Sequence, residues 1–199
     1  MRTLIHLVRH AEVENPDNTW YGRLADFHLS DRGRRQAEAL AEHFAGRTLA
    51  AVYASPLARA VETAGPIAAA QRLEVIREPD IIESVTYLQG KPADPRVFMN
   101  PLNLRFFVNP FRPSWGEPYV SISARMLGAL GRMRRAHPGK EVVAVSHMTP
   151  IGVARLRLEG DSRPPWMAGL PIGRASVTTL VFDGEERVGT EYVEVGSSV

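Results

Sequence analysis

Three short apolar runs in this chain each end in an ionisable or hydroxyl residue. Residues 4–8 lead into Arg9-His10, residues 50–54 lead into Ser55, and residues 142–145 lead into Ser146-His147. Short runs rich in branched apolar residues are typical of buried strands. Stretches with helical apolar spacing separate these runs, and that alternation predicts a parallel sheet with right-handed crossovers. The residues that follow the strands should therefore meet at one edge of the sheet, where ligands bind in such folds.

The pattern predicts a three-layer α/β/α fold with a mostly parallel central sheet, as one domain over residues 1–199. Ser30 is expected to cap a helix that begins near Asp31, and Ser55-Pro56 to start the helix that carries Arg59. A long helix is expected around residues 122–133, and another from Thr149-Pro150 to near Gly160. The predicted strands are Thr3–Val8, Ala50–Ala54, Leu73–Arg77 and Glu141–Ser146, followed by a hairpin of Val177–Phe182 and Val188–Val195 around Asp183-Gly184.

Composition excludes several classes of protein. The 199 residues contain no cysteine, which rules out disulfides, a thiolate nucleophile and cysteine-ligated metals, and fits a reducing compartment. No apolar stretch approaches the roughly 20 residues that span a bilayer, and charged residues interrupt the N-terminus before a signal peptide could form. The net charge of +2 is small and acidic residues lie near the basic runs, so nucleic acid is not an expected partner. We expect a cytoplasmic protein without a membrane partner; the sequence leaves open whether it forms a homo-oligomer.

Residues 85–118 break the alternating pattern. The segment holds six prolines together with Phe98, Phe106, Phe107, Phe111 and Trp115. Prolines at this density prevent a long helix, while the aromatic residues argue against disorder. Long ordered insertions are commonly lids or binding loops, so we predict a selectivity lid here, with Arg105 and Arg112 as anion contacts. An interface between subunits is the alternative.

The residues expected at the sheet edge have the chemistry of phosphoryl transfer. A neutral imidazole can attack phosphorus, and the charges of Arg9 and Arg59 would disfavour protonation of His10. The same two cations would bind a phosphate dianion and stabilise its transition state, so no metal or other cofactor is needed. His147 could donate a hydrogen bond to a phosphate oxygen. The six histidines also lack the clustering that metal ligation requires.

The departing alkoxide needs a proton, and Glu83 is the expected donor. A carboxyl group with a raised pKa could protonate the leaving oxygen and then deprotonate the water that hydrolyses the phosphohistidine. Glu83 follows the apolar pair Ile81-Ile82 in the sequence. Glu78 and Glu117 are the other candidates for this role.

An ordered set of motifs resembles the histidine phosphatase superfamily, in its phosphoglycerate-mutase-like branch. The motifs are residues 7–12 (LVRHAE), 21–24 (YGRL), 29–37 (LSDRGRRQA), 55–64 (SPLARAVETA), 82–83 (IE) and 145–147 (VSH). They run from the N-terminus to about residue 160, interrupted by the insertion. The resemblance implies the phosphoglycerate-mutase-like fold. It also implies that His10 is the nucleophile, that Arg9, Arg59 and His147 form the phosphate pocket, and that Glu83 is the proton donor.

Asn15, Arg23 and Met148 are further candidate substrate-binding residues, Met148 through its free amide at a helix start, although the chain departs from the family pattern near them. Ala11 stands where the family has glycine, and Met148 replaces the glycine that commonly follows the second histidine. Pro16 occupies the position of a mutase asparagine, with Asn15 one place earlier, and Ser84 stands where the mutases carry arginine. These differences weaken assignment as a phosphoglycerate mutase more than assignment as a phosphatase.

The sequence thus predicts a metal-independent phosphomonoesterase that acts on a small phosphorylated metabolite through phosphohistidine. The nearest alternative is a phosphomutase that uses the same site and returns the phosphoryl group to a second position. A catalytically silent phosphoester-binding module is a further alternative. The full set of candidate catalytic residues argues against the silent module: Arg9, His10, Arg59, Glu83 and His147.

Overall fold

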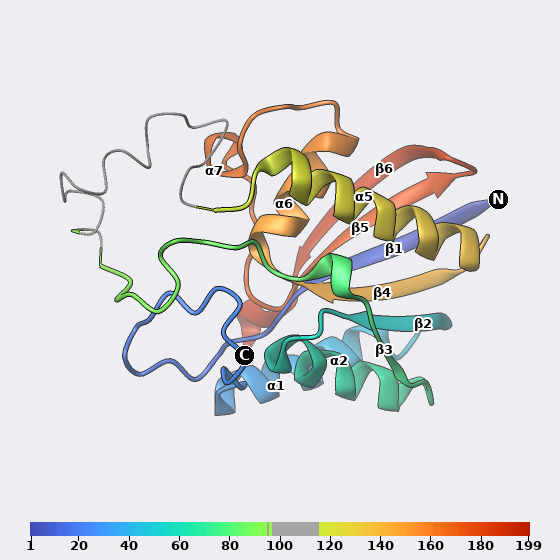
Figure 1. Ribbon diagram of the computed structural model, residues 1–199. Coiled ribbons are helices and arrows are strands. Elements are labelled where there is room, and N and C mark those ends of the chain that lie inside the picture. The colour runs from blue at the N-terminus through green and yellow to red at the C-terminus, as the bar shows by residue number, and fades with distance from the viewer. Residues whose placement is uncertain (95, 97–115) are drawn as a thin grey trace.

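A six-stranded sheet forms the centre of the computed structural model, which describes residues 1–94, 96 and 116–199. The strand order is β3-β2-β4-β1-β5-β6 (Figure 1). The first four of these run parallel, whereas β5 is antiparallel to β1 and β6 is antiparallel to β5. The strands are β1 (Arg2–Arg9), β2 (Leu49–Ala54), β3 (Val75–Arg77), β4 (Glu141–Ser146), β5 (Ser176–Asp183) and β6 (Glu186–Glu194).

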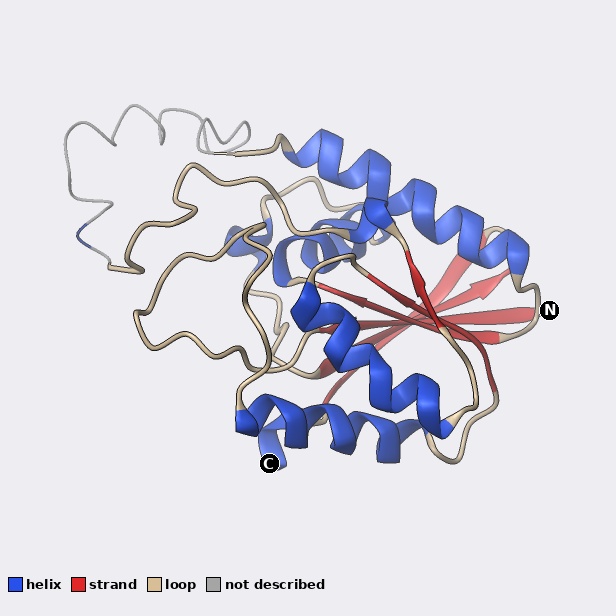
Figure 2. Cartoon of the chain, turned by 60° about the horizontal axis from the view of Figure 1, so that its bottom comes forward, coloured by secondary structure: helices blue, strands red, loops and turns tan. Residues whose placement is uncertain are grey.

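Helices cover both faces of this sheet, which confirms the predicted three-layer α/β/α fold. One layer contains α1 (Asp31–Phe44) and α2 (Ala58–Ala70), and the other contains α5 (Tyr119–Ala136) and α6 (Met148–Leu158). Figure 2 shows the strands enclosed between the two helical layers. The remaining short helices are η1 (Pro79–Ile81), α7 (Pro165–Ala168) and η2 (Gly196–Ser198). None of the helices in the described part of the chain is long and apolar enough to cross a membrane.

Two apolar clusters, one on each face of the sheet, explain why the central strands have continuous apolar sequences. In β4, Val142 and Ala144 pack into the cluster that includes α5 and α6, while Val143 and Val145 pack into the cluster that includes α1 and α2. All four residues are fully buried. A central parallel strand buries both of its faces, so it shows no polar alternation.

Most predicted element boundaries agree with the structure, and two need correction. Ser30 caps α1 as expected, because its hydroxyl accepts a hydrogen bond from the Gly33 amide at 3.0 Å. The predicted cap of α2 at Ser55 is wrong: the helix begins at Ala58, and Leu57 occupies the N-cap position. The third strand begins at Val75 rather than Leu73, because the Leu73 amide donates to the Ala68 carbonyl and closes the end of α2.

The proposed lid segment is described only at its two ends. A bridge from Thr19 to Pro92 places the first end against residues 18–22, and a bridge from Thr86 to Gly116 joins the two ends to each other. The anion contacts predicted at Arg105 and Arg112, and the aromatic residues from Phe98 to Trp115, lie outside the described residues.

Close contact between α1 and the segment after β1 generates the first prediction. A Cβ atom at Gly33 would lie 2.0 Å from the carbonyl oxygen of Glu12, which also accepts a hydrogen bond from the Ser30 amide. Gly33→Ala should therefore displace backbone two residues from His10 and lower the free energy of unfolding by about 1–3 kcal/mol. Chemical denaturation measures this. Gly46→Ala is the control, because a Cβ there meets nothing within 4 Å. Equal stability of the two variants would contradict the prediction.

Candidate active site

The carboxyl ends of β1 and β4 place two histidines side by side. His10 follows β1, His147 follows β4, and the amide of His10 donates to the carbonyl of Ser146 at 3.0 Å. The two rings have centroids 5.1 Å apart, and both residues are almost completely buried. The parallel register of these strands, which pairs Arg9 with Ser146, thus produces the juxtaposition predicted from sequence.

Hydrogen bonding identifies which nitrogen of His10 can act as a nucleophile. Nδ1 lies 2.8 Å from the carbonyl oxygen of Ala11. A carbonyl only accepts, so Nδ1 carries the proton and Nε2 carries the lone pair. Burial, followed by the charge of Arg59, holds the pKa of His10 well below its usual value of 6.5. Near neutral pH the imidazole is therefore uncharged and its Nε2 is available for attack.

Ser55 is the hydrogen-bond partner of the second histidine. The Ser55 hydroxyl lies 2.8 Å from Nε2 of His147. Burial and the neighbouring His10 hold the pKa of His147 well below 6.5, so this ring is neutral too. If the hydroxyl donates to Nε2, Nδ1 of His147 carries a proton that it can donate to a ligand. Ser55 therefore orients His147, and its Oγ also accepts a hydrogen bond from the Leu57 amide at 3.5 Å.

Two arginines beside these histidines are anchored by backbone carbonyls. Arg59 is fully buried and donates from its Nη atoms to the carbonyls of Gly22 (2.5 Å) and Leu24 (3.2 Å). The ring of Tyr21 covers its guanidinium, 4.8 Å from centroid to Cζ. Arg9 donates from Nη1 to the carbonyl of Ile172 at 2.7 Å. Within the described residues neither guanidinium has a carboxylate at ion-pairing distance, although burial lowers the pKa of each.

Three buried nitrogen atoms of this cluster lack a hydrogen-bond partner among the described residues. They are Nε of Arg9, Nε of Arg59 and Nδ1 of His147. An unpaired buried donor costs about 1–3 kcal/mol, and more when the group is charged. Here the donors surround a neutral nucleophile and include two cations. A tetrahedral dianion with several acceptor oxygens is the kind of ligand that would satisfy them.

Glu83 reaches this site from the loop after η1. Its Oε1 atom accepts hydrogen bonds from the amide of Ser84 at 2.7 Å and from the Ser84 hydroxyl at 3.2 Å. Burial raises the pKa of Glu83, against the opposing effects of Ser84, Arg59 and Arg9. Because Oε1 accepts both bonds, Oε2 is the atom better suited to carry a proton. Ser84, the departure from the mutase pattern, thus contacts the candidate acid directly.

The two other candidate acids are engaged elsewhere. Glu78 pairs with Arg132 and accepts from the amide of Asp80. Glu117 is paired with Arg23 and Arg125. Burial is the largest single effect and opposes ionisation of Glu117, but the hydrogen bonds and charges of Arg125, Arg23 and Ser121 together lower the pKa of this carboxyl. A carboxyl group held ionised by two arginines is a poor proton donor.

A cavity of about 610 Å³ opens beside His10. Several residues predicted to form the site line it: Arg9, His10, Asn15, Glu83 and Met148. Arg59 and His147 lie behind them, in electrostatic contact with His10. The Asn15 side chain is bonded to both backbone groups of Thr19. The structure does not bring Arg23 to the cavity wall: its guanidinium binds the Glu83 carbonyl and the Glu117 carboxylate instead.

Sequence reasoning overlooked Arg174, which also lines the cavity. Arg174 immediately precedes Ala175, whose amide donates to the carbonyl of Arg9 at 3.1 Å. The positive charge of Arg174 contributes to the lowered pKa values of Arg9 and His10. Because β5 is antiparallel to β1, its start lies at the edge where β1 ends. In the sequence, the predicted terminal hairpin was the feature that could have indicated that Arg174 lies at this edge of the sheet.

Comparisons with known proteins agree with this geometry. A sequence profile of the histidine phosphatase superfamily (branch 1) matches residues 5–194. An uncharacterized protein from Mycobacterium tuberculosis is 46% identical over 198 residues, covering 96% of this chain and 95% of that protein. Phosphoserine phosphatase 1 from Hydrogenobacter thermophilus is 39% identical over 169 residues, covering 82% of this chain and 80% of its own.

Similarity to solved structures supports the same relationship. YhfR from Bacillus stearothermophilus superimposes with a TM-score of 0.81 at 25% identity, covering 93% of this chain and 94% of its own. Among the described residues, no group of three or more histidine and acidic side chains is placed to hold a metal ion.

The lowered histidine pKa values predict how stability changes with pH. A group whose pKa is lower in the folded state contributes stability above its unfolded value of 6.5 and loses it as the pH falls. The melting temperature in phosphate-free buffer should therefore drop between about pH 7.5 and pH 5, and His10→Gln should reduce that drop. His28 is the control. Its hydrogen bond to Glu62 raises its pKa, so its contribution to stability changes with pH in the opposite direction.

His28→Asn should accordingly steepen the fall in melting temperature over the same range. If His10→Gln leaves the slope unchanged, or steepens it as His28→Asn does, His10 is not held neutral by the fold.

Proposed function

Because this chain belongs to the histidine phosphatase superfamily, we propose that it hydrolyses the phosphomonoester of a small phosphorylated metabolite, with a phosphohistidine intermediate on His10. The observation that carries the proposal is a group of three buried donors, near a neutral imidazole, that have no partner in the described part of the chain: Arg9 Nε, Arg59 Nε and His147 Nδ1. A phosphoryl group bound there would satisfy these donors and face Nε2 of His10.

In the first step, Nε2 of His10 donates its lone pair to phosphorus while the bond from phosphorus to the ester oxygen breaks. Glu83 transfers its carboxyl proton to that oxygen, so an alcohol departs rather than an alkoxide. Arg9 and Arg59 stabilise charge on the remaining phosphoryl oxygens, which is the largest contribution expected in phosphoryl transfer. Both arginines are held by backbone carbonyls, so they need little reorganisation during the reaction.

In the second step, the Glu83 carboxylate takes a proton from water while the water oxygen attacks phosphorus. The bond between phosphorus and Nε2 breaks, inorganic phosphate leaves and His10 regains its lone pair. The raised pKa of Glu83 suits both steps, since the same group is acid first and base second. Two guanidiniums and an imidazole supply the phosphate charge compensation, so the proposed reaction needs no metal ion.

The outer cavity wall suggests which organic groups fit. Trp20, Tyr21, Val85 and Leu88 give it an apolar surface. Arg174 adds a positive charge to the cavity lining, and its Nη1 atom donates to the Glu12 carboxylate at 3.3 Å. We therefore expect a substrate with a compact carbon skeleton and a second anionic group. Val85, Leu88 and Gly116, from the described ends of the predicted lid, line the cavity.

Turnover of a panel of phosphate esters tests the proposed function. The panel pairs esters that carry a carboxylate with neutral alcohol phosphates of similar size, assayed with and without EDTA. We expect release of inorganic phosphate that EDTA leaves unchanged, a lower KM for the carboxylate esters, and loss of that KM difference in Arg174→Ala. Transfer of phosphate to a second position on the substrate, with slow release to water, would instead identify a phosphomutase. No turnover of any ester, or loss with EDTA restored by a divalent metal, would overturn the proposal.

The role of Glu83 predicts a dependence on the leaving group. Glu83→Gln should lower kcat for alkyl phosphates by about 100-fold or more, because an alkoxide leaves poorly without a proton. p-Nitrophenyl phosphate should be affected far less in its first step, since its phenolate leaves unaided. Pre-steady-state release of p-nitrophenolate measures that step. Equal slowing of both substrates would point to a binding role instead.

A further inference from the structure

Four successive carbonyl oxygens, from Asp80 to Glu83, each accept a hydrogen bond from a side chain. Arg125 Nη1 donates to the carbonyls of Asp80 and Ile82, at 2.6 Å each. The Ser146 hydroxyl donates to Ile81 at 2.7 Å, and Arg23 Nε donates to Glu83 at 2.6 Å. Residues 80–83, here called the acid segment, end at the proposed proton donor.

The two arginines that hold the acid segment are joined by one carboxylate. Glu117 accepts from Nε and Nη2 of Arg125, at 2.8 and 3.1 Å, and from Nη2 of Arg23 at 2.8 Å. The side chains of Glu117 and Arg125 are only 12% and 13% exposed. We call Arg23, Glu117 and Arg125 the carbonyl clamp. It is a connected network of hydrogen bonds to charged groups, and such networks fix geometry.

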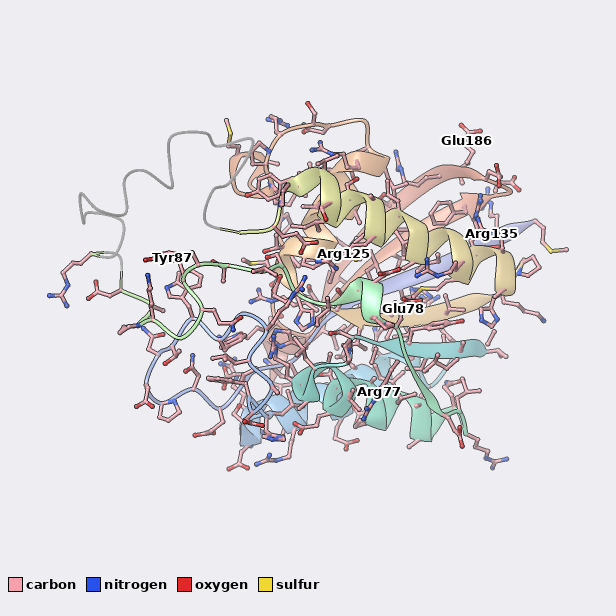
Figure 3. All side chains as sticks on the ribbon, in the orientation of Figure 1. Arg77, Glu78, Tyr87, Arg125, Arg135 and Glu186 are labelled. Carbon is pink, nitrogen blue, oxygen red and sulfur yellow. The ribbon has the colours of Figure 1, made fainter. Side chains whose placement is uncertain are left out.

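The acid segment has little regular structure of its own to hold it. It passes from the single turn of η1 into residues 82–85, which belong to no helix or strand. Figure 3 shows Arg125 projecting from α5 toward this part of the chain. Gly116 allows its own backbone to pack closely against Val85, because a Cβ at position 116 would lie 2.1 Å from the Val85 carbonyl oxygen. The amide of Glu117 also donates to that carbonyl at 3.0 Å.

We propose that the carbonyl clamp is the positioning device for Glu83: it holds the backbone of the acid segment so that the carboxyl faces the ester oxygen. This inference rests on the proposed function, since it assumes that Glu83 is the proton donor. The clamp residues act through Glu83 and are positioning residues. Arg125 contributes through geometry: its Nη1 bridges two carbonyls while Nε and Nη2 hold Glu117. A lysine keeps the charge but cannot make this set of bonds.

The test compares Arg125→Lys with Arg134→Lys. Both arginines lie on α5, each has a side chain 13% exposed, and each bridges a glutamate and a backbone carbonyl. Arg134 bonds Gly184 and Glu185 at the β5–β6 turn, away from the acid segment. Arg125→Lys should lower kcat for an alkyl phosphate about tenfold or more, and the pre-steady-state release of p-nitrophenolate by less than about threefold. Arg134→Lys should leave both rates near wild type.

A double-mutant cycle shows whether the effect passes through Glu83. In the Glu83→Gln background, Arg125→Lys should change the alkyl phosphate rate by less than about twofold, because the group it positions can no longer donate. Equal slowing of both substrates by Arg125→Lys, or an effect that adds to that of Glu83→Gln, would overturn the clamp while leaving the acid role intact. Absence of leaving-group dependence in Glu83→Gln alone would remove the acid role, and the clamp proposal with it.

The thermal stability of Arg125→Lys decides which variant is used for the rate comparison. If thermal unfolding shows that Arg125→Lys is not folded, Arg23→Lys carries the same comparison, because it loses the bond to the Glu83 carbonyl from a side chain 31% exposed. A folded Arg23→Lys with wild-type rates on both substrates would overturn the proposal.

Discussion

The charges of Arg9 and Arg59, which have no carboxylate at ion-pairing distance among the described residues, determine the electrostatics of this site. Isolated charges are costly to bury, by several kcal/mol each even after relaxation. Arg59 is completely buried, yet its bonds go to two carbonyls, and the ring of Tyr21 covers its guanidinium. A carboxylate beside it would stabilise the protein but would compete with an anionic ligand. The fold therefore supports the arginines with dipoles and leaves their net charge to the ligand.

The same positive charge accounts for the protonation of the neighbouring groups. Together with burial, it keeps His10 and His147 neutral, one as nucleophile and the other as donor. Burial moves Glu83 in the opposite direction and raises its pKa, although the arginines partly oppose this. Two neutral imidazoles and a protonatable carboxyl can thus share one site with two cations. The direction of each pKa shift favours the protonation state that the proposed first step requires.

The sequence was sufficient for the parts of the fold and site that depend on local pattern. The strands whose ends carry functional residues can be recognised in the sequence as apolar runs. Their parallel arrangement brings His10 next to His147. Long-range side-chain bonds were not visible. Ser55-Pro56 looks like a helix start, and only the position of His147, 92 residues away, shows where the hydroxyl is used. Arg23 was predicted to bind substrate, yet it bonds to the backbone of Glu83, because the partner that directs it, Glu117, lies 94 residues further along the chain.

The central claim is that His10 bonds covalently to phosphorus. The most direct measurement mixes the wild-type enzyme with p-nitrophenyl phosphate carrying a radiolabelled phosphoryl group and quenches the reaction in base within the first turnover. Glu83→Gln should accumulate more of the intermediate, because its second step lacks a base. The account predicts label on a peptide that contains His10, stable in alkali and lost in acid, and no label in His10→Ala. Turnover with no labelled protein in the wild type or in Glu83→Gln would contradict it. Label retained in His10→Ala would contradict it as well.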